Sequence, residues 1–273
     1  NGDQVYFSQG NLQYQASTNT WRFAENQYSF VGGVDYQTGV DCGNVYENGV
    51  KCDNSLLSSS YDGWIDLFGW GTSGYNHGAN CYEPWSTSQY GSDYFAYGIA
   101  TCNLYDQTGQ ADWGYNAISN GGNTTGQWRT LTADEWFYVI NSRTTTSGIR
   151  YAKAKVDEVR GVILLPDNWS TNIYSLNSTN IVSASYTSNI ISALQWETLE
   201  VAGALFLPVG GYRVNDLVEW IDVGGYGTYW TSTCYNNNHA CGLFFTDNSL
   251  CTQTYNYAGR IDGQLVRLVQ DAN

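Results

Sequence analysis

Residues 225–269 read GYGTYWTSTCYNNNHACGLFFTDNSLCTQTYNYAGRIDGQLVRLV and contain two kinds of position. Apolar side chains recur at Leu243 and Phe245, and successive side chains of a strand point to opposite faces. This spacing predicts a strand with one inward face, and we expect Phe244 and Cys241 on the opposite face. The stretch therefore predicts a scaffold strand that holds up a surface.

The other positions of this stretch carry small, polar, aromatic and thiol side chains in no regular order. We predict that they form one exposed ligand-binding face within residues 229–263, called the candidate face below. Its members are Cys234, Tyr235, Asn237, His239, Cys241, Gly242, Phe244, Thr246, Asn248, Cys251, Tyr255, Tyr257, Ile261 and Asp262. An ordinary two-faced strand with a tolerant exterior remains the alternative.

The composition indicates a globular domain outside the cell. The chain has 273 residues, 42 % of them apolar, which is enough for a core, and no linker is visible, so we expect one domain over residues 1–273. It is rich in Tyr, Asn, Ser, Thr and Gly and poor in Lys, which is typical of exported proteins. No signal peptide is visible and Met is absent, so we expect a trimmed N-terminus.

The charge balance excludes two classes of partner. Charged residues make up 13 % of the chain and the net charge is −14. Nucleic acid and anionic membrane surfaces both require clustered Lys and Arg, which this chain lacks. Since no apolar run approaches the roughly 18 residues of a membrane helix, we expect no transmembrane segment.

The seven cysteines predict disulfides more readily than a metal centre. Cys42 with Cys52 and Cys81 with Cys102 are our predicted pairs, although four cysteines allow three connectivities. No zinc-type spacing is present, so no metal cofactor is expected. A structural calcium site remains an alternative to a solvated loop, with the ligands Asp35, Asp41, Glu47 and Asp53.

Local patterns predict an α+β domain with two main helices, short antiparallel strands and long ordered loops. Thr132 with Glu135, and Ser192 with Gln195, are capping boxes that begin helices over 132–142 and 193–202; Gly203 ends the second. Expected strands are a pair within 5–23, a hairpin of 149–155 with 159–165, and 204–208, 229–235, 240–245 and 265–269. Residues 61–116 are dense in Trp, Gly and Tyr, which predicts loops pinned by aromatic side chains, with sugar binding as the alternative.

The sequence RTLTADEWFY at residues 129–138 resembles the Arg-Leu-Pro-Thr-x-x-Glu-Trp-x-Tyr stretch of the formylglycine-generating-enzyme (sulfatase-modifying factor) family. The closing GQLVR at 263–267 is similar to that family's Gly-Phe-Arg-type terminal strand. The resemblance covers about residues 125–270, and residues 1–124 match mainly relatives from gut Bacteroidales. It implies a C-type-lectin fold in its larger, loop-rich form.

Within that fold, residues 225–269 look like the variable region of a diversity-generating-retroelement target protein of Bacteroidales type. Such systems randomise template adenines, and the resulting codons cannot encode Lys, Glu, Gln, Trp or Met. Between Cys234 and Asp262 only Gln253 belongs to that set, and the Asn run 236–238 agrees with such codons. The same mechanism accounts for three scattered cysteines.

The resemblance implies a non-enzymatic binding protein, a surface adhesin or receptor whose ligand is a protein or a glycan. An extracellular lectin-like structural domain without diversification is one alternative. The other is an enzyme of the formylglycine-generating type, which uses paired cysteine thiolates to hold copper. Val266 stands at the terminal-strand position where that family carries a cysteine, and we expect no cofactor and no turnover.

Overall fold

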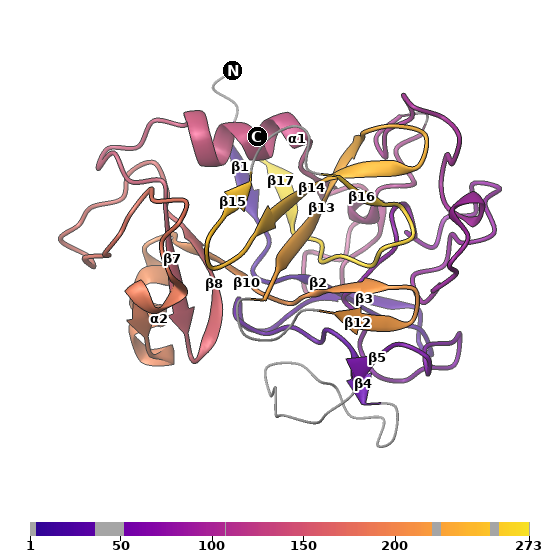
Figure 1. The fold of residues 1–273 in the computed structure, drawn as a ribbon, viewed down its shortest axis with the longest axis horizontal. Helices are drawn as coiled ribbons and strands as arrows, with labels where there is room; N and C mark the ends of the chain where they lie inside the picture. The colour runs from indigo at the N-terminus through magenta and orange to yellow at the C-terminus, as the bar shows by residue number, and fades with distance from the viewer. Residues whose placement is uncertain (1–3, 36–51, 107, 220–224, 252–256, 273) are drawn as a thin grey trace.

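The computed structural model describes residues 4–35, 52–106, 108–219, 225–251 and 257–272. Two α-helices, α1 (Ala133–Phe137) and α2 (Ala193–Val201), occur in this part, together with short strands in small, mainly antiparallel sheets. The architecture is α+β, as predicted. Long connections fill one side of the molecule (Figure 1). On the other side, α2 lies against the sheet that contains the hairpin of residues 151–164.

The two ends of the described chain lie in one sheet. Strand β1 (Val5–Phe7) pairs antiparallel with β17 (Leu268–Asp271), which also pairs with β6 (Arg129–Thr130). Figure 1 shows both ends beside α1. Predicting β1 as part of a hairpin within residues 5–23 was therefore wrong. That hairpin consists of β2 (Leu12–Gln15) and β3 (Thr20–Phe23) alone.

Helix α1 begins at the predicted capping box. The Thr132 hydroxyl accepts from the Glu135 N–H, while the Glu135 carboxylate accepts from the Thr132 N–H at 2.7 Å. These contacts satisfy main-chain donors that a helix start leaves without partners. After Phe137 the chain continues to Ser142 as a π-helical turn, so the predicted extent is confirmed but the last part is not α-helical.

The predicted second hairpin is present as β7 (Tyr151–Val156) and β8 (Val159–Leu164). Its turn residues Asp157 and Glu158 have φ of 46° and 67°, the left-handed pair that matches the twist of a tight hairpin. Strand β10 (Leu205–Pro208) extends this sheet next to β8, and β9 (Ile190–Ile191) runs parallel to β7. Helix α2 covers it with Trp196 and Leu199.

The loops within residues 61–116 are held by indole side chains, as predicted. The Trp70 indole donates to the Thr231 carbonyl at 3.0 Å, and the Trp113 indole donates to the Thr72 carbonyl at 2.9 Å. The only regular elements described there are the short 3-10 turns η1 (Gly91–Asp93) and η2 (Trp113–Tyr115). These loops pack against the sheet that carries the candidate face.

That central sheet contains β13 (Gly227–Cys234), β14 (His239–Phe245), β15 (Leu250–Cys251) and β16 (Tyr257–Gly259). Both faces of β13 are buried, because Trp230 packs in one apolar cluster and Tyr229 in another. A neighbouring sheet joins β11 (Tyr212–Val214), β12 (Leu217–Glu219), β5 (Cys52–Asp53) and β4 (Val34–Asp35).

Candidate functional site

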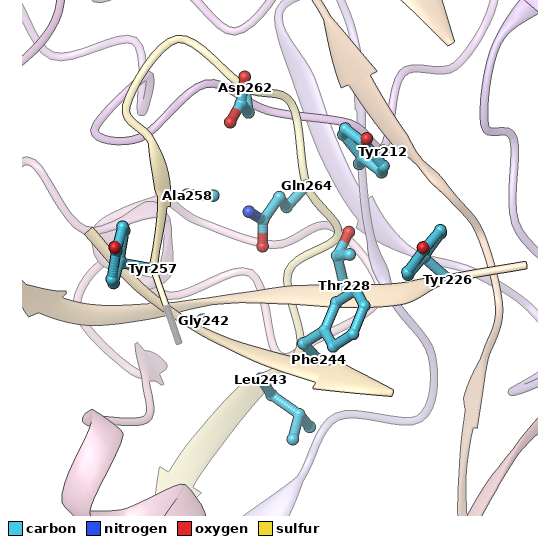
Figure 2. A pocket seen from close by; sticks show the side chains of 10 residues that line it. All are labelled: Tyr212, Tyr226, Thr228, Gly242, Leu243, Phe244, Tyr257, Ala258, Asp262 and Gln264. Atoms are coloured by element: carbon cyan, nitrogen blue, oxygen red, sulfur yellow. The ribbon is translucent and has the colours of Figure 1, made fainter. Parts of the chain in front are cut away.

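A pocket of about 330 Å³ opens on the central sheet, beside the candidate face. Strands β13, β14 and β16 supply one part of its lining, and β11 with the segments before β13 and after β16 supplies the rest (Figure 2). The lining residues are Tyr212, Tyr226, Thr228, Gly242, Leu243, Phe244, Tyr257, Ala258, Asp262 and Gln264. The pocket is therefore built from chain segments that only the tertiary structure brings together.

Aromatic rings form two opposite walls. On one side, Tyr226 packs edge-on against Tyr212 with centroids 6.2 Å apart, and lies 4.8 Å from the ring of Phe244. On the other side, Tyr257 stacks on Tyr235 at 4.2 Å with ring planes 4° apart. Each pair restrains its rings, because offset and edge-on packing stabilise aromatic pairs beyond simple burial.

Gly242 leaves room for the pocket at the middle of β14. A Cβ at this position would lie 3.0 Å from the side-chain oxygen of Gln264 and 3.1 Å from the Tyr229 carbonyl oxygen. Any larger residue at position 242 would thus push against the Gln264 amide. A substitution at this candidate-face position changes the shape of the pocket directly.

Two polar side chains line the pocket, Gln264 without a hydrogen bond to its amide and Asp262 without an ion pair among the described residues. Gln264 is 4 % exposed, and its amide forms no hydrogen bond to a described residue. Burial raises the pKa of Asp262 to about 6, against the opposing effects of a hydrogen bond from the Gly259 N–H and the positive charge of Arg213. The pocket thus combines aromatic walls with a carboxylate and a carboxamide.

Arg213 lies near this carboxylate, but its two terminal nitrogens donate to other groups. Its guanidinium is buried and donates to the carbonyl oxygens of Asn215, Ile261 and Ser86. No salt bridge joins Asp262 to a residue in the described part of the chain. Its charge is therefore only partly balanced.

The structure brings part of the candidate face to the pocket: Gly242, Phe244, Tyr257 and Asp262 line it. Exposed members are Asn237, Asn248 and Tyr257, the last 51 % exposed. Half-buried members are Cys234, Tyr235, His239, Gly242, Phe244, Thr246, Ile261 and Asp262. Tyr255 and the side chain of Cys251 lie outside the described residues.

Placing Cys241 on the outer face was wrong. Positions 241, 243 and 245 share one parity along β14, so Cys241 points to the same side as Leu243 and Phe245 and is only 4 % exposed. Burial raises the pKa of its thiol to about 11. A cysteine at this position belongs to the interior of the sheet.

Sequence reasoning missed the pocket residues outside the candidate face, namely Tyr212, Tyr226, Thr228, Leu243, Ala258 and Gln264. One signal was available for Gln264, a polar residue that interrupts the apolar positions of the closing strand. Tyr212 and Tyr226 had no such signal, because their approach to β14 depends on how β11 packs beside the central sheet.

The structure tests one of the two predicted disulfides, and the ligand side chains of the predicted calcium site lie outside the described residues. Cys81 is a buried thiol, so the predicted Cys81–Cys102 bridge is not formed. Cys42, and the side chains of the four proposed calcium ligands, lie outside the described residues.

Among the described residues, no three His, Cys, Asp or Glu side chains lie close enough together to bind a metal ion. The helices in this part of the chain are too short and too polar to span a membrane.

Comparison with protein-family models, with curated proteins and with solved structures finds no match to this chain.

Proposed function

We propose that this chain is a non-enzymatic ligand-binding protein with a C-type-lectin fold, whose candidate face is diversified by a retroelement. The observation that carries the proposal is how the face is anchored. Residues outside the candidate face hold it through main-chain atoms, so that its side chains can change without losing those contacts.

Arg260 is the first of these anchors. Its buried guanidinium donates to the carbonyl oxygens of Phe95, Ala96, Ile99 and Asn236, the last at 2.7 Å. It also lies 4.8 Å from the Trp70 ring centroid, within the range of a cation–π contact. One fixed side chain thus joins the 95–99 loop to the tip of the β13–β14 hairpin.

Two further anchors act in the same way. The Gly98 N–H donates to the Asn237 carbonyl at 2.8 Å. The buried Lys153 ammonium donates to the carbonyls of Thr246 at 2.7 Å and Asp247 at 3.1 Å, at the other end of β14. Contacts to main-chain carbonyls do not depend on the side chain present, which is the property a diversified surface requires.

The face also has the chemistry of a binding surface. Its tyrosines supply large, rigid contact area with a polar tip, as tyrosines do in antibody binding sites. We place such a protein outside the cell or on its surface as an adhesin or receptor, in agreement with its composition. Because the side chains would be produced by randomisation, the ligand is not inherited with the fold.

The neighbouring DNA tests this proposal. We expect a near-copy of codons 225–269 beside a reverse transcriptase gene, with adenines in the copy at the codons of candidate-face members such as Asn237 and His239. Codons of Trp230, Arg260 and Phe245 should be unchanged in the copy. A locus with neither the copy nor the reverse transcriptase gene would contradict diversification and favour the plain structural domain.

A further inference from the structure

The amide of Gln264 is the starting point, because it lies in the pocket without a hydrogen bond to a described residue. Most buried polar groups have hydrogen-bond partners, and leaving one without a partner is unfavourable. Gln264 is 4 % exposed, and Figure 2 shows its amide in the middle of the pocket, between Tyr257 and the pair Tyr212 and Tyr226. A bound group that excludes water from this amide must therefore exchange hydrogen bonds with it.

The second observation is the charge at one end of the pocket. Asp262 carries a carboxylate whose only hydrogen bond described here comes from the Gly259 N–H. The charged and titratable groups around it are Arg213 on β11, whose two terminal nitrogens donate to carbonyl oxygens, and the hydroxyls of Tyr94 and the pocket tyrosines. Arg213 balances the Asp262 charge only in part, so a positively charged ligand group would complete the balance.

The third observation is the size and lining of the space. A volume of about 330 Å³ is at the lower end of the range for small-ligand sites, which run from about 300 to 1,000 Å³. Tyr257 lies on one side and Tyr226 with Phe244 on the other, and an alkyl stem can lie in the slot between these aromatic walls. Cations also bind favourably to the faces of such rings.

On this basis, and resting on the proposed binding function, we infer that the pocket receives a cationic side chain, lysine or arginine, of a protein ligand. Its ammonium or guanidinium group donates to the Asp262 carboxylate and to the Gln264 side-chain oxygen, and its stem lies between the aromatic walls. A neutral sugar would leave the carboxylate with only the partial counter-charge of Arg213.

Titration calorimetry with small probes tests this assignment. The probes are Nα-acetyl-lysine amide and Nα-acetyl-arginine amide, with Nα-acetyl-norleucine amide as the neutral match and methyl glycosides of mannose and N-acetylglucosamine as the sugar arm. We expect saturable binding of at least one cationic probe, with a Kd on the order of 1 mM because a small ligand makes few contacts. The neutral match should not bind measurably.

Variants locate the binding. Asp262→Asn and Gln264→Leu are each expected to weaken the cationic probe by about tenfold or more, since each removes an acceptor from a desolvated charge. Gly242→Val should also weaken it by narrowing the slot. Asp62→Asn is the matched control, an exposed carboxylate outside the pocket with the same charge change, and should leave the Kd unchanged.

The pH dependence of probe binding distinguishes the loss of a charge interaction from the loss of packing. Protonating Asp262 removes the counter-charge, so affinity should fall about tenfold between roughly pH 7.5 and roughly pH 5, and this dependence should disappear in Asp262→Asn. Binding of a glycoside instead of the cations, or equal binding of the norleucine probe, overturns the inference, as does silence of all the probes. None of these results affects the DNA test, so failure of the two proposals can be told apart.

Discussion

At the scale of single residues, the alternation of side chains along β14 decides which side of the sheet each candidate-face residue of this strand occupies. Gly242 and Phe244 open onto the pocket, whereas Cys241 points to the same side of β14 as the buried Phe245. A cysteine in the interior is a small apolar group rather than a nucleophile, because the reactive form is the thiolate and burial disfavours it.

We therefore expect Cys241 to resist alkylation in the native protein. Its pKa of about 11 leaves it protonated at neutral pH, and its sulfur is shielded. Timed maleimide labelling followed by peptide mass spectrometry should show Cys234 modified well before Cys241, since Cys234 is only half-buried. In denaturant both should react at similar rates. Equal labelling in the native state would contradict the burial of Cys241.

Asp262 should make stability depend on pH. Its folded pKa of about 6 lies above the usual value of 3.8, so its contribution is fully present below about pH 4 and is lost as pH rises through about 6. Asp262→Asn removes that loss, and is expected to stabilise the fold by about 2 kcal/mol at pH 7. Urea unfolding at several pH values measures this.

The control for that measurement is Asp62→Asn, which alters an exposed carboxylate. It should change the unfolding free energy little at any pH. If Asp262→Asn destabilised the protein at pH 7 and not at pH 4, the carboxylate would be stabilising when ionised, which is the opposite sign.

At the scale of elements, the β13–β14 hairpin separates residues that hold the fold from residues that form the surface. Trp230 and Phe245 are fully buried in different apolar clusters, while Asn237 and Tyr257 are exposed on the same pair of strands or beside it. The two kinds of position are only a few residues apart in the chain, yet they should respond differently to substitution.

Trp230→Ala and Phe245→Ala are each expected to cost about 3–5 kcal/mol, the range for deleting a buried aromatic side chain. Asn237→Ser should stay within about 0.5 kcal/mol, as surface substitutions do. Tyr257→Ser should cost little more, through its lost stack on Tyr235. Chemical denaturation of the four variants compares them, and similar losses at both kinds of site would refute the division into scaffold and face.

At the scale of the whole molecule, the C-terminal strand β17 joins distant parts of the chain. It pairs with β1, and Arg129 links its last residue Asp271 to Glu135 on α1, with contacts of 2.8 Å to each carboxylate. The adjoining Arg267 is buried and donates to Asn11 and Gln27. The described ends of the chain, in β1 and β17, are therefore joined to each other and to α1.

Removing the Arg129 link should loosen this arrangement modestly. Its partners are partly exposed, so we expect Arg129→Gln to cost about 1 kcal/mol, with a smaller loss at high salt, since exposed ion pairs are screened. Amide hydrogen exchange should rise first in β17 and β1. Glu25→Gln, which removes the exposed partner of an ion pair with Arg22, is the control and should change neither. Unchanged exchange in β17 would mean that backbone pairing alone holds the ends.

Local elements followed closely from the sequence. The two capping boxes, the turn at Asp157 and Glu158, and the strand around Leu243 depend on residues within a few positions of each other. The partner of β1 did not follow, because pairing of the chain ends is decided by packing across the whole molecule. For the same reason, the sequence did not predict that Tyr212 and Tyr226 line the pocket.

By itself, the sequence determined the α+β class and the helix starts, because periodicity and capping are local properties. Only the tertiary structure decided that Cys241 is interior, that Arg260 and Lys153 hold the face through main-chain carbonyls, and that Asp262 and Gln264 meet in one aromatic slot. Those features depend on distances between segments far apart in the chain, which no local pattern encodes.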